Sequence, residues 1–307
     1  MMIELTSTPI ILMVILGVAG MIIPVINVVR KERGSSTFYG AIAFGALLLA
    51  LGFVIFQFYD DNLAPAAIFS EDVLVDDGFG SFFAIAMLIV SIMTVAGSFN
   101  YMRKKSNPAI YFSLILLSSI GMVLIAFATD LVMLFVAWEL MSIPTYILAG
   151  FNKKNPSSNE AAIKYFLFGA LSSGIIIYGI SLAYGITGST NIGDVIYGFS
   201  NLSPDMLPLG LLAIGMFIAG FGFKMGLVPF HMWLPDTYEG SPPTITALLA
   251  AGTKKAGFAA ALRIIIMGAA ALNLDWTLAL GVIAIMTMTI GNVAAIMQKN
   301  LTRMLAY

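Results

Sequence analysis

The sequence predicts an all-α polytopic membrane protein, on three observations. Hydrophobic residues make up 60% of the 307 residues, and charged residues make up only 10%. A soluble domain carries roughly a quarter charged residues, so this chain could not cover itself in water, and a lipid bilayer is its expected environment. Apolar runs long enough to cross a bilayer recur along the whole chain. Since every backbone polar group in lipid needs an internal partner, we expect these runs to be helices.

The predicted spans follow from length. Crossing the hydrocarbon takes about 20 apolar residues. Runs of that kind lie at 9–29, 37–59, 79–101, 109–128, 131–151, 161–186, 208–230, 243–270 and 276–298. The first run follows neither a basic leader nor a cleavage site, so we expect a retained helix. Another run begins near 301, and the sequence ends at Tyr307. A helix that short cannot cross a bilayer, so we expect a fragment or a chain that a partner completes.

The connections between the runs alternate in charge. Basic residues follow the first, third, fifth and ninth runs: Arg30, Lys31, Arg33, Arg103, Lys104, Lys105, Lys153, Lys154, Lys299 and Arg303. The alternate connections hold acidic residues: Asp60, Asp61, Glu71, Asp72, Asp76, Asp77, Asp130, Asp194, Asp205 and Asp275. Basic loops face the cytoplasm, so we expect the N-terminus outside and the basic loops cytoplasmic, in the cell (inner or plasma) membrane. The loop around Asp236 and Glu239 is cytoplasmic by count but carries no basic residue.

The composition excludes several kinds of site. The chain has no cysteine, so it can hold no iron–sulfur cluster, thiolate metal site or disulfide. Its single histidine, His231, argues against haem and against a multi-histidine metal centre. The net charge of −1 gives no sign of nucleic-acid binding. We therefore expect no cofactor and no metal on this chain, and any electrons to pass through other subunits.

Charged side chains inside the predicted spans are the candidate functional residues. A charge at the bilayer centre costs about 2.5–3.5 kcal/mol and usually marks an ion pathway. The positions are Glu139, Lys164, Lys224, Lys254 and Lys255. Arg263 is a further candidate, but it lies close enough to the outer surface that we expect it to snorkel.

Each of these positions also has a structural interpretation. Lys164 could pair with Glu160 one turn earlier as an interfacial anchor. One of the adjacent Lys254 and Lys255 is expected to be structural, because neighbouring residues point about 100° apart on a helix. Glu139 has no basic residue within a turn, so its partner must come from another helix. A purely structural Glu139–Lys224 ion pair is the alternative to a proton-transfer role.

The predicted span that carries Lys224 also carries a helix break. Glycines and a proline crowd its cytoplasmic end: Gly220, Gly222, Gly226 and Pro229. Broken helices at membrane depth line hydrated cavities, and transporters use them at ion sites. Burial disfavours a charged lysine and a nearby carboxylate favours it. Moving or protonating Glu139 would therefore switch Lys224 between holding and releasing a proton, with Lys254 as a further step.

Five stretches carry a family resemblance: Trp138–Pro144, Glu160–Ala170, Lys224–Asp236, Ser241–Lys254 and Gln298–Tyr307. Through them the chain resembles the antiporter-like, proton-translocating membrane subunits of respiratory complex I. The likeness is greatest to subunit N and extends to the homologous subunit of archaeal F420H2 dehydrogenase. It covers nearly the whole chain from about residue 70 onward.

The resemblance implies a fold and residue roles. The fold would be an antiporter-like helix bundle with two inverted five-helix repeats. Three N-terminal helices in 1–107 would precede a complete first repeat with a broken helix in 108–270 and a truncated second repeat in 271–307. Glu139 would control the channel lysine Lys224. Lys164 would be the input lysine, and Lys254 the link onward, with Lys255 as an ambiguity.

The Pro-Phe-His-x-Trp stretch of the same family contains His231. His231 could relay protons or cap the end of the broken helix. Trp233 and Tyr238 are expected to be interface anchors.

The implied function is that of a non-redox subunit of a proton-translocating NADH-quinone or F420H2-quinone oxidoreductase. Its partners would be the other membrane subunits and a peripheral redox arm, which would carry the flavin, the iron–sulfur clusters and the quinone-type acceptor. The alternatives are an Mrp-type cation/proton antiporter subunit, a subunit of a membrane-bound hydrogenase without quinone chemistry, and an inert scaffold with structural ion pairs.

Overall fold

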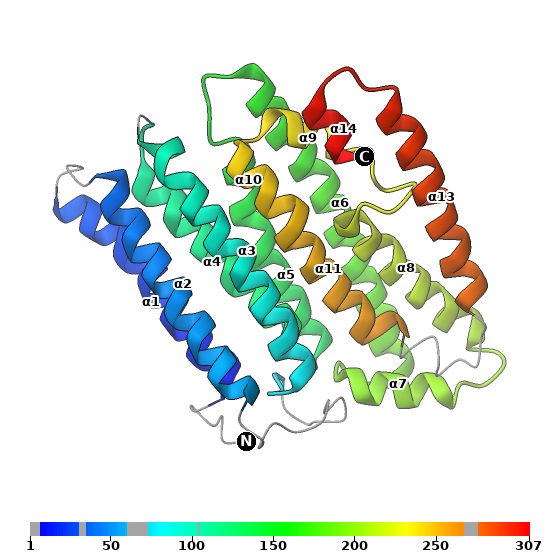
Figure 1. Cartoon of the computed structure of the whole chain (residues 1–307). Coiled ribbons are helices and arrows are strands. Elements are labelled where there is room, and N and C mark those ends of the chain that lie inside the picture. Colours follow the sequence, from blue (N-terminus) through cyan, green and yellow to red (C-terminus); the bar gives the residue numbers. More distant parts are fainter. Residues whose placement is uncertain (1–6, 31–34, 60–72, 104, 267–275) are drawn as a thin grey trace.

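The computed structural model describes residues 7–30, 35–59, 73–103, 105–266 and 276–307. Long helices run side by side along one common direction, and shorter helices lie at the two ends (Figure 1). Eight of the described helices are long and apolar enough to cross a membrane. The prediction of an all-α polytopic membrane protein is therefore confirmed.

The described helices are α1 (Thr8–Val29), α2 (Ser36–Tyr59), α3 (Gly78–Met102), α4 (Pro108–Phe127), α5 (Leu131–Ala149), α6 (Pro156–Thr187), α7 (Ile192–Ser200), α8 (Leu207–Met225), α9 (Leu234–Gly240), α10 (Pro243–Ala247), α11 (Lys254–Ala261), α13 (Trp276–Ile296) and α14 (Leu301–Ala306), with π-helical segments η1 (Leu248–Thr253) and η2 (Leu262–Ile266). Helix α4 is the most buried of these eight helices: 83% of the residues in its most apolar stretch lie inside the protein. In α13 only 6% of the corresponding residues are buried. The core therefore lies around α4, and α13 forms an edge (Figure 1).

Polar residues in the connections act as helix caps. The side chains of Asp77, Asp130, Asn155 and Asn191 accept hydrogen bonds from the first backbone N–H groups of α3, α5, α6 and α7. These N–H groups have no partner within the helix, so a capping oxygen is needed. The cap at Asn155 lets α6 begin before the predicted residue 161, through a polar first turn.

The predicted span 243–270 is not one regular α-helix. It begins as α10, widens into η1, continues as α11 and widens again into η2. Such π-helical insertions are rare and are frequent at functional sites. The predicted run is therefore helical as expected, with two π-helical segments inside it, and residues 267–270 lie outside the described part.

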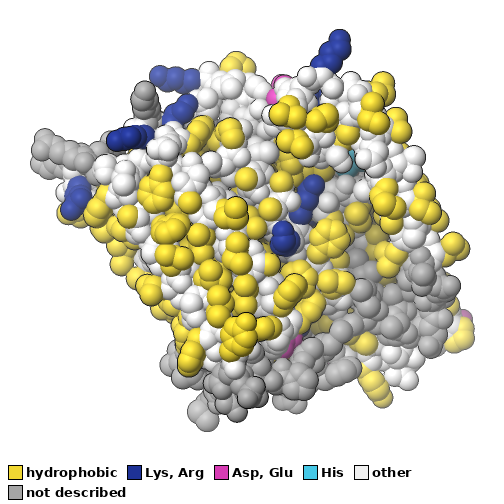
Figure 2. Space-filling model, in the orientation of Figure 1, with side chains coloured by type: hydrophobic (Ala, Val, Ile, Leu, Met, Phe, Trp, Pro, Cys, Tyr) yellow, Lys and Arg dark blue, Asp and Glu magenta, His cyan; other side chains and the backbone are white. Residues whose placement is uncertain are grey.

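Basic side chains gather at one end of the bundle. Figure 2 shows them along the edge where α1 ends and α4 begins, and some also lie in the middle of a largely apolar face. The apolar face is consistent with contact with lipid.

Arg263 does not snorkel to the surface, contrary to the expectation. Its side chain is 4% exposed, and its Nη2 donates to both carboxylate oxygens of the fully buried Asp77, at 2.8 and 2.9 Å. Its Nε also donates to the carbonyl oxygen of Ala126, at 2.9 Å. Asp77 caps α3, so this buried ion pair joins η2 to the start of α3 and the end of α4.

Replacing either member of this pair should destabilise the protein strongly. Asp77→Ala or Arg263→Ala leaves one buried charge without a partner, which costs about 3–5 kcal/mol of unfolding free energy. Unfolding of the purified protein in detergent measures this loss. Arg103→Ala, at an exposed position, is the control and should change it by less than about 0.5 kcal/mol. Equal stability of all three variants would refute the buried pair.

Candidate functional site

Lys224 lies buried in the last turn of α8. Its side chain is 1% exposed. Its Nζ donates hydrogen bonds to the Ser142 hydroxyl of α5, at 2.9 Å, and to the Tyr165 hydroxyl of α6, at 2.8 Å. The Nζ also lies 5.9, 5.5 and 5.0 Å from the ring centroids of Trp138, Tyr146 and Tyr165. Hydroxyl oxygens and ring faces therefore stabilise the ammonium group.

Glu139 lies one turn before Ser142 on α5. Its carboxylate accepts a hydrogen bond from the Ser173 hydroxyl of α6. Among the described residues it forms no direct ion pair with Lys224. Residues three apart share a helix face, and Lys224 contacts Ser142 on that face. The acid and the amine thus lie along the same face of α5 without an ion pair between them among the described residues.

Helix α8 ends directly after Lys224. Gly226 adopts φ 77°, a left-handed conformation that glycine accepts without steric cost. The N–H of Gly226 donates to the Phe223 carbonyl, and the N–H of Leu227 donates to the Gly222 carbonyl. This pair of bonds is a Schellman motif, which terminates helices. The predicted run 208–230 therefore ends as a helix at Met225, and Pro229 lies in the loop that follows.

Trp233 packs against the residues next to Lys224. Its indole N–H donates to the Phe223 carbonyl at 3.1 Å, and its ring stacks on Tyr165 with centroids 4.7 Å apart. Trp233 and Tyr238 are 1% and 3% exposed. The expectation that they are interface anchors is wrong, because both side chains pack inside the protein.

Lys254 and Lys255 point in different directions. The Nζ of Lys254 lies 5.6 Å from the Tyr238 ring centroid. It also lies next to Gly226, 3.6 Å from the position that a Cβ atom would take on that glycine. The Nζ of Lys255 donates back to the Ala251 carbonyl of the preceding turn, at 3.2 Å. The structure therefore brings Lys254, and not Lys255, to the break in α8.

Several hydroxyl groups near these lysines were not singled out from the sequence. Ser142, Tyr165 and Ser173 bond the charged groups, and their only sequence signal is a hydroxyl within an apolar run. The Tyr238 hydroxyl, the Thr237 Oγ1 and the Ser241 Oγ are buried without a hydrogen-bond partner among the described residues. Buried polar groups are nearly always hydrogen-bonded, to water where no protein group is near.

Lys164 lies apart from Lys224, at the end of the bundle that carries the basic loops. It pairs with Glu160 at 2.6 Å, as the anchor alternative requires, and also with Asp236 of α9 at 2.5 Å. The second partner, 72 residues away, was not predicted.

His231 lies in the loop between α8 and α9. Its Nδ1 is buried and has no hydrogen-bond partner among the described residues. No hydrogen bond joins its side chain to the end of α8, so the described geometry does not make it a cap. Burial lowers the pKa of His231 below its usual value, which keeps the imidazole neutral at pH 7.

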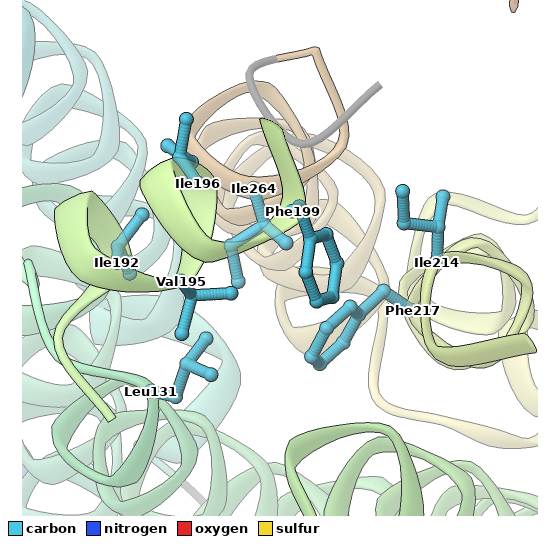
Figure 3. A pocket seen from close by; sticks show the side chains of 8 residues that line it. All are labelled: Leu131, Ile192, Val195, Ile196, Phe199, Ile214, Phe217 and Ile264. Atoms are coloured by element: carbon cyan, nitrogen blue, oxygen red, sulfur yellow. The ribbon is translucent and has the colours of Figure 1, made fainter. Parts of the chain in front are cut away.

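The cavity under α7 is a packing gap and not a ligand site. Figure 3 shows the apolar side chains that line it: Leu131, Ile192, Val195, Ile196, Phe199, Ile214, Phe217 and Ile264. Its volume of about 10 Å³ is no larger than one water molecule needs.

Comparisons with known proteins place this geometry in a family. Residues 128–307 match the family model described as NADH:quinone oxidoreductase/Mrp antiporter, transmembrane region. Subunit N of F420H2 dehydrogenase from Methanosarcina mazei is 45% identical over 78% of this chain and 48% of its own length. Subunit N of NADH-quinone oxidoreductase from Trichlorobacter lovleyi is 40% identical over 96% of this chain and 59% of its own length.

A solved structure has the same fold. A chain of respiratory complex I from Thermus thermophilus superimposes with a TM-score of 0.78 and 31% identity, over 96% of this chain and 61% of that one. This chain thus spans about half to three-fifths of the length of these relatives. The expected resemblance and the antiporter-like helix bundle are confirmed: the chain belongs to the NADH:quinone oxidoreductase/Mrp antiporter family of membrane proteins.

Proposed function

We propose that this chain is a proton-translocating membrane subunit of a complex I-type respiratory oxidoreductase. One observation carries the proposal: Lys224 is buried beside a broken helix, and its hydrogen-bond partners are hydroxyls and not carboxylates. A charge at membrane depth is costly and is retained mainly where an ion moves.

The hydroxyl partners suit both protonation states of the lysine. A charged Nζ donates to Ser142 and Tyr165. A neutral Nζ can accept from either hydroxyl, because a hydroxyl both donates and accepts. A direct carboxylate ion pair would hold the proton on the amine, and the described residues form none at Lys224. Lys224 can therefore load and release a proton without leaving a buried polar group unpaired.

Glu139 supplies the control in this mechanism. A negative charge near Lys224 favours the ammonium form, and its neutralisation or withdrawal favours release. Ser173, on the neighbouring helix α6, donates a hydrogen bond to the Glu139 carboxylate. Protonation of Glu139 would thus alter the field at the lysine without breaking either hydrogen bond of its amine.

Onward transfer runs from Lys224 toward Lys254. The Tyr238 ring lies 5.6 Å from the Lys254 amine and 6.5 Å from the ring of Trp233, which stacks on Tyr165, a hydrogen-bond partner of Lys224. Moving one charge against about 150–200 mV costs about 3.5–4.6 kcal/mol, so more than one step is needed. Lys164 serves as the entrance and His231 as a relay in this proposal. The N-terminus faces outward and the basic loops face the cytoplasm.

The redox chemistry belongs to partner subunits. The relatives named above are subunits N of an NADH-quinone oxidoreductase and of an F420H2 dehydrogenase. By that likeness the chain works among other membrane subunits and a peripheral arm that holds flavin, iron–sulfur clusters and a quinone-type acceptor. Its own contribution is non-redox: it moves protons.

Lys224→Ala and Glu139→Gln test the proposal. Each should lower proton pumping by about 100-fold, the usual contribution of a proton-transferring side chain. Pumping is followed with a pH-sensitive dye in liposomes that hold the assembled complex. Lys154→Ala, at an exposed loop position, is the control. Full pumping by the assembled Lys224→Ala complex would favour the scaffold interpretation.

Lys254→Ala and Lys255→Ala form a matched pair of neighbours. Because only the Lys254 amine reaches the break in α8, its loss should slow pumping by about 100-fold. Loss of Lys255 removes one hydrogen bond to a backbone carbonyl and should change pumping by less than about 2-fold. A larger loss of pumping in Lys255→Ala than in Lys254→Ala would assign the proton-transfer role to Lys255.

Tyr165→Phe tests the hydroxyl partner. The Lys224 Nζ would keep only Ser142, at a cost of about 1–3 kcal/mol for the unpaired buried donor. Unfolding in detergent measures this cost, and pumping should slow as well. Tyr178→Phe, 52% exposed on the same helix, is the control. If the two variants behave alike, the Tyr165 hydroxyl has no role at the lysine.

A further inference from the structure

Asp236 joins two cations that belong to distant parts of the chain. Its Oδ2 accepts from the Lys164 Nζ of α6 at 2.5 Å, and its Oδ1 accepts from the Arg303 Nη1 of α14 at 2.7 Å. These partners are 72 and 67 residues away in sequence. We call Lys164, Asp236 and Arg303 the charged link. Helix α9, which carries Asp236, lies between α6 and α14 (Figure 1).

Each cation of the link has one further carboxylate partner. Lys164 pairs with Glu160 at 2.6 Å, and Arg303 pairs with Glu239 at 2.8 Å. Asp236 is therefore the only group among the described residues that bonds both cations. The side chains are 27–37% exposed, so each single pair contributes little to stability. The significance of the link is geometric: one carboxylate fixes α9 to both of its neighbours.

The link is also connected to the Lys224 site. On α6, Lys164 directly precedes Tyr165, which bonds the Lys224 amine. At the start of α9, three residues before Asp236, Trp233 stacks on Tyr165. A shift of α9 would therefore move a ring that contacts the Lys224 site and, at the same time, a carboxylate that holds Lys164.

We propose that Asp236 is a positioning residue that couples α14 to the half-channel, by holding Lys164 and Arg303 at once. This inference rests on the proposed function. When Arg303 bonds Asp236, the carboxylate divides its charge between two cations and Lys164 can release its proton more readily. When α14 moves away, Asp236 binds Lys164 alone and holds that proton more firmly. The position of α14 thus controls how readily Lys164 passes protons toward Lys224.

The link works by movement and not by titration of Asp236. The charged groups around it are Glu160 and Lys164 from α6, Glu239 from α9 and Arg303 from α14. Burial raises the pKa of Asp236, but hydrogen bonds from Lys164 and Arg303 outweigh burial and keep the pKa below its usual value. Because a lowered carboxyl pKa means that the interaction is lost only as the pH falls through that value, Asp236 stays ionised from pH 5 upward.

Asp236→Asn in the assembled complex is the test, with pumping in liposomes measured from pH 5.5 to 8.5. We expect pumping to fall by about 10-fold, within the range by which coupling residues act, and its pH profile to shift, because Lys164 loses its second carboxylate. Asp236→Glu should restore both. Glu239→Gln removes a partner of Arg303 without touching Lys164 and should change pumping by at most about 2-fold.

The coupling to α14 has its own variant, Arg303→Gln. It leaves Asp236 and Lys164 in place, so it should slow pumping and shift the same pH profile. The double variant Asp236→Asn with Arg303→Gln should be no slower than Asp236→Asn alone. Arg303→Gln alone decides the matter if Asp236→Asn fails to assemble.

Normal pumping and an unchanged pH profile in either single variant would overturn the inference, as would equal effects of Asp236→Asn and Glu239→Gln. If these results occur while Lys224→Ala still abolishes pumping, only the positioning role fails. If Lys224→Ala pumps normally, the proposed function fails instead.

Discussion

The structure depends on keeping one ammonium group, that of Lys224, stable in a place without bulk water. Three helices contribute to this: α8 carries the lysine, and α5 and α6 supply the hydroxyls and most of the rings around it. Because these partners are neutral, the site tolerates the amine with or without its proton. A carboxylate in contact would have given a more stable pair and a less mobile proton.

The same requirement accounts for the end of α8. A continuous helix would bond the carbonyls near Lys224 to residues of the next turn. At Gly226 the chain instead turns away, and the Trp233 indole bonds one of these carbonyls from the returning segment. That segment then forms α9, which brings Trp233 against Tyr165 and Asp236 against Lys164. The broken helix thus positions both the buried Lys224 and the charged link around Asp236.

Much of this architecture could be predicted from the sequence, because the signals are local. Runs of apolar residues gave the spans, and buried charges such as Glu139 and Lys224 stood out from them. The partners of those charges could not be predicted in the same way. Arg263 reaches Asp77 across 186 positions, and Lys164 reaches Asp236 across 72. Hydroxyl residues such as Ser142 and Tyr165 are common in membrane helices, so composition alone does not mark them.

The π-helical segment η1 immediately precedes Lys254. A π-turn holds one residue more than an α-turn, and each residue turns an α-helix by about 100°. Rewinding this single turn would rotate α11 by one position, and a matching change in η2 would keep Arg263 paired with Asp77. The amine facing Gly226 would then be exchanged for a neighbouring side chain. A rotation of this kind needs no domain motion. The helical form of η1, α or π, would then determine whether Lys254 or a neighbouring residue faces Gly226.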